Sequence, residues 1–495
     1  MVMSPLPTSL YRAEQVREGE RAAAQVMQLE MYQLMERAGQ AVFSALIGKY
    51  PDTDSVLVCC GGGNNGGDGY VVARLAREHG LNVQLWHLGN ASQLTGDAAI
   101  ARDAWLAAGG EIGVPQAEAP ESVEVIIDAL LGTGLKGSVR PDCATLIKTI
   151  NRAICPVIAV DVPSGLCADT GTHSGLAVQA DITVTFIGVK QGLCTGLAAR
   201  YCGEIQFAGL EVAEAFQQLT EPASVRIDER QILPHLPVRD RAAHKGDHGR
   251  VLCVGGDLGM AGAIRLAAEA SARTGAGLTA VITQPGNVLS IVTARPEIMV
   301  QGWQEKAHEI SQRLDWADVV VIGPGLGQSD WSQALFFYLH GCEKKTVIDA
   351  DGLNLLSFSP DYKNNRIITP HPGEAARLLG TTVKEVEADR FRAVRSLQQK
   401  YGGVAVLKGA GTLIYDGQQL WICSEGNPGM ATGGMGDVLS GIIGALLGQG
   451  LSLPDAACAG VWIHSKAADL CARDGERGML ASDLFPYIRQ LVNPR

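Results

Sequence analysis

The sequence predicts two doubly wound α/β domains in a single chain. Short runs of β-branched and other apolar residues alternate with stretches of helical periodicity, and many of these runs end in a glycine-rich or acidic loop. Such alternation is typical of parallel strands that helices cover on both faces. The pattern occurs in both halves of the chain, and a proline-punctuated stretch separates the halves.

The predicted strands follow one another along each half. In the first half they are residues 55–60, 82–88, 123–128, 156–161 and 181–187. In the second half they are residues 251–254, 278–283, 318–322, 346–349 and 366–369. Doubly wound folds bind ligands in the loops after the carboxyl ends of their strands, so functional residues are expected in these loops.

The boundary between the domains is predicted near residue 220. The stretch 211–237 begins as a polar, helix-like segment and then contains Glu221-Pro222 and Leu233-Pro234. We therefore expect residues 1–218 to form the first domain and residues 219–495 the second. At the start of the chain, residues 9–47 are predicted to form one or two amphipathic helices that pack against the first domain or a second subunit.

Composition indicates a folded protein of the cytoplasm. Of its 495 residues, 46% are hydrophobic and 19% are charged, as in globular proteins. The net charge of −11 and the absence of a basic tract argue against nucleic acid and anionic membranes as partners. The 12 cysteines form no CxxC pair, which favours reduced core cysteines. The start of the chain does not look like a signal peptide, and the apolar stretch 438–451 is expected to be a buried helix.

The loop 61–69 (GGGNNGGDG) is the most informative feature of the first half. Its glycines match GxGxxG, in which backbone N–H groups bind a diphosphate at a helix N-terminus. A redox Rossmann domain would also have an acidic residue at the end of the next strand, and residues 85–90 contain none. A turn needed only for packing does not explain Asn64, Asn65 and Asp68, so we favour a ligand-binding loop.

Two further loops of the first half follow strand ends. Asp128 closes one strand, and the loop 132–138 then carries Lys136. A lone loop lysine is usually solvated, but the flanking glycines and the position after a strand favour a function here. Asp161 begins the sequence DVPSG at the end of another strand, where an acidic residue could also simply cap a turn.

Together these loops resemble the N-terminal domain of the NAD(P)HX epimerases, the YjeF N-terminal family. The shared motifs are NNGGDG, D-x-x-x-GTGLKG and DVPSG, and the resemblance covers about residues 9–215. It implies a hydrated nicotinamide dinucleotide as substrate, and K⁺ bound by the hard oxygen ligands of Asn65, Asp128 and Ser164. The substrate-contacting residues that it implies are Asn64, Asn65, Gly66, Gly67, Asp68, Gly132, Thr133, Gly134, Leu135, Lys136, Gly137, Ser138 and Asp161.

The chemistry of this substrate suggests roles for two residues. NAD(P)HX carries a hydroxyl at C6 of its reduced ring. The ring nitrogen can expel this hydroxyl, and water can return on the other face. Such a site needs an acid/base group and a counter-charge for the transient cation. We assign the acid/base role to Asp161, and phosphate binding or assistance in proton transfer to Lys136.

In the second half, two stretches indicate a nucleotide site. KGAGT at 408–412 connects two apolar strands, and GGMGD at 433–437 opens a long apolar helix. Free N–H groups at that helix N-terminus would bind phosphate, and Asp437 could take a proton from a hydroxyl. An acidic residue in a first helical turn explains Asp437 alone, without the glycines. His371 lies between two prolines at a strand end, and no Walker-type GxxxxGK[ST] occurs.

This half resembles the ribokinase-like superfamily and, within it, the ADP-dependent NAD(P)HX dehydratases of the YjeF C-terminal family. The motifs are HKGDHG, GPGLG, DADGLN, TPHPGE, LKGAGT and GGMGD, over about residues 225–492. The hydrate pocket that the resemblance implies is lined by Ala263, Gly325, His371 and Asp437. The nucleotide-binding residues that it implies are Lys408, Gly409, Ala410, Gly411, Thr412 and Gly436.

The resemblances predict a Rossmann-like N-terminal domain, a ribokinase-like C-terminal domain and a function in metabolite repair. The first domain would interconvert R and S NAD(P)HX. In the second, Asp437 would deprotonate the C6 hydroxyl of the S form, and ADP with Mg²⁺ would phosphorylate it. Elimination would then give NAD(P)H, AMP and phosphate. We expect NADHX, NADPHX and ADP as small-molecule partners and a homo-oligomeric enzyme.

Two alternatives stay open at this point. A ribokinase-type small-molecule kinase fused to a dinucleotide-binding domain would explain the glycine loop and Asp437 equally well, but it gives the first domain no purpose. A non-catalytic dinucleotide sensor would bind such ligands without turnover.

Overall fold

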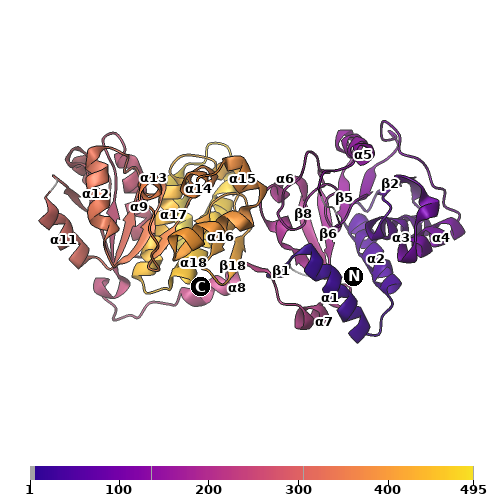
Figure 1. Ribbon diagram of the computed structural model, residues 1–495, viewed down its shortest axis with the longest axis horizontal. Coiled ribbons are helices and arrows are strands. Elements are labelled where there is room, and N and C mark those ends of the chain that lie inside the picture. The colour runs from indigo at the N-terminus through magenta and orange to yellow at the C-terminus, as the bar shows by residue number, and fades with distance from the viewer. Residues whose placement is uncertain (1–5, 135–136, 305, 494–495) are drawn as a thin grey trace. The chain divides into compact units, whose positions relative to one another are not determined.

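The computed structural model describes residues 6–134, 137–304 and 306–493. The chain forms two compact units, the first ending at Val225 and the second beginning at Arg226 (Figure 1). This division lies within the proline-punctuated stretch 211–237.

The first unit contains a six-stranded, fully parallel sheet with the strand order β3-β2-β4-β5-β6-β8. Its strands are β2 (Ser55–Cys60), β3 (Asn82–His87), β4 (Val125–Ala129), β5 (Val157–Val160), β6 (Ile182–Phe186) and β8 (Glu204–Ala208). Because β3 lies on one side of β2 and β4 on the other, the strand order reverses between β2 and β4. Ligands bind at such switch points in doubly wound folds.

Helices cover both faces of this sheet, as the apolar runs predict. Val58 of β2 packs in the cluster that contains α2 and α3, whereas its neighbour Leu57 packs in the cluster that contains α5. The helices are α1 (Ala13–Val26), α2 (Met31–Lys49), α3 (Asn64–Glu78), α4 (Gly96–Ala107), α5 (Pro141–Arg152), α6 (Ala198–Tyr201) and α7 (Ala213–Leu219). The short strand β1 (Ser9–Tyr11) pairs with β7 (Val189–Lys190) and with the start of β9 (Ser224–Arg226).

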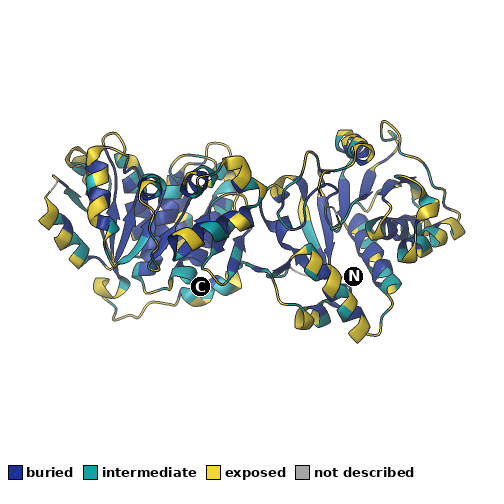
Figure 2. Cartoon of the chain, in the orientation of Figure 1, coloured by how far each residue is buried: buried dark blue, intermediate teal, exposed yellow. Residues whose placement is uncertain are grey.

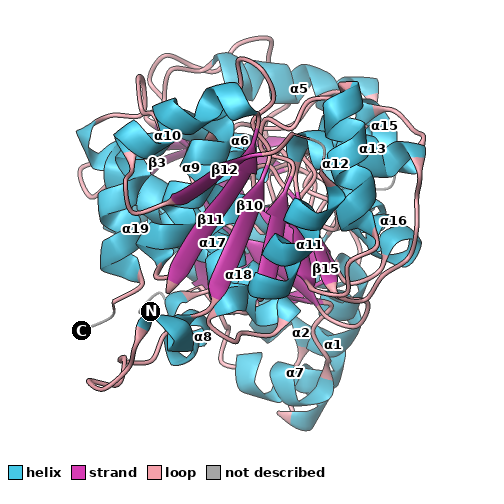
Figure 3. Cartoon of the chain, turned by 90° about the vertical axis from the view of Figure 1, so that its left-hand side faces the viewer, coloured by secondary structure: helices cyan, strands magenta, loops and turns pink. Residues whose placement is uncertain are grey.

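The second unit contains a larger sheet, with the order β12-β11-β10-β13-β14-β15-β16-β17-β18. Figure 3 shows β12, β11 and β10 side by side, with helices on either side of them. The strands are β10 (Arg250–Val254), β11 (Leu278–Thr283), β12 (Met299–Gly302), β13 (Val319–Ile322), β14 (Lys345–Ile348), β15 (Arg366–Ile368), β16 (Val404–Leu407), β17 (Thr412–Tyr415) and β18 (Leu420–Cys423). Pairing is parallel from β12 to β16 and antiparallel from β16 to β18.

Helix α17 lies in the core of this unit. Its apolar side chains are buried between the sheet, α9 and α18 (Figure 2), which confirms the predicted buried helix. The helices are α8 (Glu229–Ile232), α9 (Ala261–Thr274), α10 (Val288–Ala294), α11 (Ala307–Trp316), α12 (Asp330–His340), α13 (Ala350–Phe358), α14 (Pro372–Leu379), α15 (Val383–Ala388), α16 (Arg390–Tyr401), α17 (Met435–Gly448), α18 (Leu453–Cys471) and α19 (Phe485–Leu491). None of the helices in the described ranges is long and apolar enough to cross a membrane.

Candidate functional site

A pocket of about 750 Å³ lies at the switch point of the first unit. The loops after β2 and β4 form one part of its wall, and side chains of α1 and α2 form another. The predicted residues that line it are Asn64, Asn65, Asp68, Gly132, Thr133, Gly134, Ser138 and Asp161. Loops distant in the sequence are thus brought together, as the parallel strand order requires.

The other predicted substrate-contacting residues of this unit are not among those that line the pocket. Leu135 and Lys136 lie outside the described residues. Gly137 is exposed in the same loop, with a positive φ of 81°. Gly66 and Gly67 are buried in the first turns of α3, and neither lines the pocket.

Gly66 allows close backbone packing beneath the pocket. A Cβ at this position would overlap the carbonyl oxygen of Gly61, which is backbone and cannot rotate away. We expect Gly66→Ala to destabilise the first unit by about 1–3 kcal/mol, the usual cost of forcing extra volume into a packed site. Urea unfolding of the full chain measures this loss of stability. Gly62→Ala is the control, because a Cβ at Gly62 would have nothing within 4 Å. Equal stability of the two variants would contradict the packing role of Gly66.

Asp161 is held in a fixed position by a buried lysine. Lys190, whose side chain is 1% exposed, forms an ion pair with Asp161 Oδ1 and also donates to Thr185 Oγ1 at 3.2 Å. Asp161 Oδ1 accepts further hydrogen bonds from Thr185 Oγ1 (3.2 Å) and from the backbone N–H of Phe186 (3.4 Å). Asp161 itself has a φ of 66°, a left-handed conformation that is rare for a non-glycine residue. Surrounding bonds therefore fix its carboxylate at the pocket wall.

Other carboxyl groups also line the pocket, namely Glu20, Asp68 and Asp97. Burial raises the pKa of Glu20 to about 7, with Lys190 lowering it and Asp161 raising it. Burial also raises the pKa of Asp68 well above its usual value, and the charges of Asp161 and Glu20 add to this effect. Carboxyl groups with a raised pKa in one pocket are typical of sites of proton transfer.

Asp128 and Ser164 form a buried pair behind the pocket. Asp128 accepts hydrogen bonds from Ser164 Oγ (2.6 Å) and from the Ser164 backbone N–H (2.8 Å). Burial raises the pKa of Asp128 to about 6, although these hydrogen bonds oppose the shift.

Asn65 offers a buried amide in the same region. Its Nδ2 is buried and has no partner among the described residues. The Asn65 side chain packs against Gly132. The preceding residue, Leu131, donates its backbone N–H to Ser164 Oγ, so Asn65 lies close to the Asp128–Ser164 pair. Turning the amide over would place its oxygen where Nδ2 now lies, and oxygen is what a hard cation binds. The residues present are therefore compatible with a monovalent cation.

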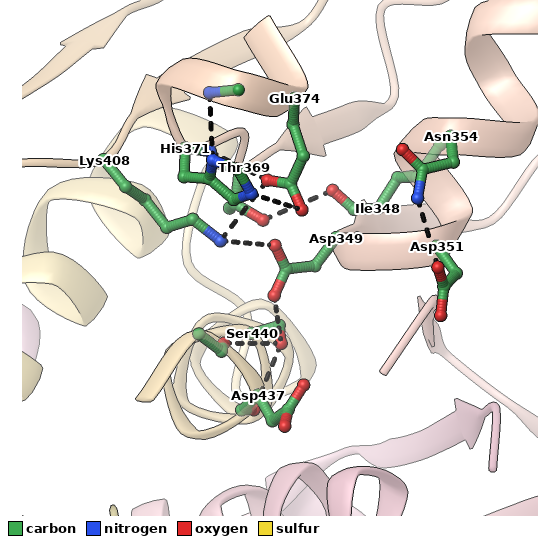
Figure 4. A network of polar contacts seen from close by, with 12 residues as sticks. Ile348, Asp349, Asp351, Asn354, Thr369, His371, Glu374, Lys408, Asp437 and Ser440 are labelled. Atoms are coloured by element: carbon green, nitrogen blue, oxygen red, sulfur yellow. Dashed lines mark hydrogen bonds and ion pairs between the residues drawn. The ribbon is translucent and has the colours of Figure 1, made fainter. Parts of the chain in front are cut away.

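In the second unit, Lys408 is the centre of a charged cluster (Figure 4). Its Nζ lies 2.7 Å from Asp349 Oδ1 and 3.9 Å from Glu374 Oε2, and Ser440 Oγ donates to Asp349 Oδ2 at 3.2 Å. Burial alone would lower the pKa of Lys408, but Asp349 and Glu374 outweigh it and raise it. Lys408 directly follows β16 and Asp349 directly precedes α13, whereas Glu374 and Ser440 lie on α14 and α17.

Asp437 lies in the first turn of α17, next to this cluster. Burial and then the charge of Asp349 raise its pKa to about 7, and Lys408 opposes them. Gly436 lies directly against Lys408, because a Cβ there would be 3.0 Å from Nζ. A carboxyl with a pKa raised to about 7 therefore lies at a helix N-terminus, where the first N–H groups have no partner within the helix.

His371 caps α14 in this structure. Its Nδ1 accepts a hydrogen bond from the backbone N–H of Gly373 (3.0 Å), and its Nε2 lies 3.4 Å from Glu374 Oε1. Burial and the charge of Lys408 lower the pKa of His371, which favours its neutral form. The ring is half exposed.

The other predicted residues of the second unit lie in two groups. Ala263 and Gly325 are in contact, since a Cβ on Gly325 would be 3.0 Å from Ala263 Cβ. Leu266, one turn after Ala263 on α9, packs against Gly434 at the start of α17, which places Ala263 at the same end of the unit as Asp437. The loop after β16 contains Gly409, Ala410 and Gly411, and Thr412 begins β17.

This loop is held from behind by a buried arginine. Arg390 donates to the carbonyl oxygens of Leu407 (3.3 Å) and Lys408 (3.2 Å), and Thr412 Oγ1 donates to the carbonyl oxygen of Gly409 (3.1 Å). These hydrogen bonds hold the backbone of the loop in place.

Sequence reasoning missed several residues of these clusters: Glu20, Lys190, Asp349, Glu374 and Ser440. Asp349 and Glu374 lie in the motifs DADGLN and TPHPGE, at strand or helix ends where a charged partner for Lys408 could have been sought. Glu20 and Lys190 carry no local signal, because only the tertiary fold brings them to the pocket.

A separate cavity of about 1210 Å³ in the second unit contains none of the predicted residues. It lies at the C-terminal end of α17, where Leu446 and Gln449 line it, whereas Asp437 is at the other end of that helix. Cavity size alone does not locate the chemistry in this unit.

Comparisons with known proteins agree with the resemblances drawn from the motifs. The family model described as YjeF-related protein N-terminus matches residues 31–192, and the one described as NAD(P)H-hydrate dehydratase matches residues 251–490. The second unit is similar to a ribokinase-like superfamily protein from Enterococcus faecalis, with 30% identity, a TM-score of 0.51, and coverage of 54% of this chain and 94% of that one. This confirms the ribokinase-like fold.

Two relatives match almost the whole chain. A protein from Vibrio cholerae is 52% identical over 490 residues, covering 99% of each chain, and one from Escherichia coli K12 is 50% identical, covering 99% of this chain and 95% of its own. Both are named bifunctional NAD(P)H-hydrate repair enzyme Nnr. The chain thus belongs to the family of bifunctional NAD(P)H-hydrate repair enzymes.

Proposed function

We propose that this chain repairs hydrated nicotinamide dinucleotides in two steps. The first unit interconverts R and S NAD(P)HX, and the second dehydrates the S form at the expense of ADP, giving NAD(P)H, AMP and phosphate. The main support is that relatives named bifunctional NAD(P)H-hydrate repair enzymes align over 99% of the chain. Joining the two activities is chemically sensible, because the first supplies the epimer that the second consumes.

Asp437 is the proposed base of the dehydratase. It takes the proton of the C6 hydroxyl, whose oxygen then attacks the terminal phosphoryl group of ADP. The free N–H groups at the start of α17 and the fixed loop at 408–412 bind the phosphates and neutralise the charge that develops. Elimination of phosphate restores the reduced ring. Oxygen-18 in the C6 hydroxyl should then appear in phosphate, and its appearance in water would exclude this route.

Mg²⁺ is proposed to enter with the nucleotide. The described residues include no group of three or more His, Cys, Asp or Glu side chains able to hold a metal ion alone. Mg²⁺ commonly uses one or two carboxylates together with substrate phosphates, and Glu374, whose Oε2 lies 3.9 Å from the Lys408 ammonium, is the carboxylate proposed to contribute. When bound, it would offset phosphate charge.

Asp161 is the proposed acid/base residue of the epimerase. It exchanges a proton with the water or hydroxyl at C6, while the carboxylates of the pocket balance the positive charge of the ring intermediate. Asn64, Asp68 and the loop at 132–138 contact the dinucleotide. Asn65, Asp128 and Ser164 would hold K⁺, which would supply a fixed positive charge behind the substrate.

The pH dependence of dehydration tests the role of Asp437. Because the base must be ionised and its pKa is raised to about 7, kcat/KM for S-NADHX should fall about tenfold per unit below pH 6.5 and level off above pH 8. Initial rates of NADH formation at saturating ADP give the profile. Asp437→Glu should keep an acidic limb with a displaced midpoint. A profile for the unchanged protein that is flat from pH 5.5 to 8 would contradict the assignment.

The kinase alternative has a different product. A ribokinase-type kinase would leave a stable phosphorylated compound, whereas the proposed reaction releases free phosphate with one NADH for each AMP. Mixing S-NADHX, ADP and Mg²⁺ with the protein and counting NADH, AMP and phosphate separates the two functions.

A further inference from the structure

Glu20 lines the epimerase pocket from a helix that the matched N-terminal family model does not include. It lies on α1, whereas that model begins at residue 31. Arg17 and Val16, which are one turn earlier on the helix, line the same pocket, so this face of α1 forms part of its wall. Gly19 packs against Phe216 of α7, which fixes the helix on the unit.

The proposed epimerisation needs proton transfer at two positions. The hydroxyl leaves from one face of the ring and water returns on the other, and one rigid carboxyl cannot reach both faces equally. Asp161 is rigid, since Lys190, Thr185 and the Phe186 N–H all bond to its Oδ1. A second group must therefore come from another element of the pocket wall.

We propose that Glu20 is the second proton-transfer residue of the epimerase, acting on the ring face that Asp161 does not reach. This inference rests on the proposed function of the first unit. Glu20 is half-buried and sits on a helix, whereas Asp161 follows β5. The two carboxyls thus belong to different elements of one pocket and have separate positions.

The step balances in protons and electrons. In one direction the Glu20 carboxyl gives its proton to the C6 hydroxyl, the C6–O bond breaks, and the ring nitrogen lone pair forms a C=N⁺ bond with C6. Water then attacks C6 from the other face, its oxygen forms the new C–O bond, and its proton passes to the Asp161 carboxylate. The reverse direction uses the same groups in opposite roles, and exchange with solvent returns the proton to Glu20.

The charges around Glu20 agree with this use. Burial raises its pKa to about 7, Asp161 raises it further, and Lys190, Arg21 and Arg17 lower it. At neutral pH both protonation forms of Glu20 are populated, as a group that is acid in one direction and base in the other requires. Asp68 belongs to another element, α3, and burial together with the charges of Asp161 and Glu20 raises its pKa well above the usual value.

The test compares Glu20→Gln with Glu18→Gln, an exposed glutamate on the same helix outside the pocket. Purified R-NADHX is incubated with the full-length protein without ADP, and formation of S-NADHX is followed by chromatography. We expect Glu20→Gln to slow epimerisation about 100-fold or more, and Glu18→Gln to leave it unchanged. Glu20→Asp should recover part of the rate and keep a pH-dependent profile near neutrality, which Glu20→Gln should lose.

Dehydration of S-NADHX by the same preparations serves as the control for folding and concentration, and it should be equal in all of them. A Glu20→Gln rate within twofold of the Glu18→Gln rate would overturn the proposal. So would a reduced rate whose pH profile matches that of the unchanged protein, because that is the result of a structural role. If the unchanged protein does not interconvert the epimers at any pH, the proposed function of the first unit fails instead.

Discussion

Asp437→Asn is expected to abolish recovery of NADH from S-NADHX, with a loss in kcat of about 10²–10⁴-fold. Asparagine has nearly the same shape but cannot take the proton of the C6 hydroxyl. The loss should appear in kcat rather than in KM, because the glycine N–H groups and the Lys408 cluster that surround the site are unchanged. Stopped assays with S-NADHX, ADP and Mg²⁺ measure it, and Asp315→Asn, at an exposed position on α11, is the matched control.

Folding and catalysis can be separated for this variant. The pKa of Asp437 is raised in the folded state, so the fold disfavours its charged form, and the resulting penalty is fully present above about pH 7. Below the ordinary pKa of an aspartate the residue is protonated in both states and the penalty disappears. Asp437→Asn should therefore raise the unfolding temperature of the second unit at pH 8 and change it little at pH 3.5. An inactive variant with a lowered unfolding temperature at pH 8 would indicate a structural defect rather than a lost base.

Asp161→Asn is expected to slow epimerisation by about 10²–10⁴-fold, as Asp437→Asn slows dehydration, and to leave dehydration intact. With a mixture of R and S NADHX, NADH recovery should stop at the amount of S initially present, plus whatever converts spontaneously. The unchanged protein should recover NADH from both epimers. Full recovery by Asp161→Asn at the rate of the unchanged protein would contradict the assignment.

This variant also removes the partner of a buried ammonium. Breaking a buried ion pair from one side typically costs about 3–5 kcal/mol, and Lys190 is buried here. Lys190→Met combined with Asp161→Asn removes both charges and should restore most of the lost stability. Epimerisation should stay absent in the double variant. If the double variant regains activity, the role of Asp161 is to neutralise Lys190 rather than to move a proton.

The general architecture was predictable because it depends on local patterns. Continuous apolar runs predicted the parallel strands, and the ends of those strands predicted the loops from which Gly62, Gly63, Gly132, Thr133 and Gly134 line the first pocket. The start of α17 at a glycine run followed from the same reasoning.

What the sequence could not show depends on contacts between distant segments. Lys190 comes from a two-residue strand that follows a left-handed residue, Ile187, and nothing in its neighbourhood predicts an ion pair with Asp161. Glu20 looks like any polar residue of an amphipathic helix. Gly66 has a packing role that its place in GxGxxG did not indicate: it is buried against the Gly61 carbonyl and does not line the pocket, and its contact with the dinucleotide stays a prediction.

One progress curve tests most directly whether the two units act on successive forms of one compound. The full-length protein is mixed with a known ratio of R and S NADHX, excess ADP and Mg²⁺, and NADH absorbance is followed to completion. We expect NADH equal to the sum of both epimers, reduced to the S fraction by Asp161→Asn and to background by Asp437→Asn. If the unchanged protein yields only the S fraction, or consumes ADP without forming NADH, the two units do not act on successive forms of one compound.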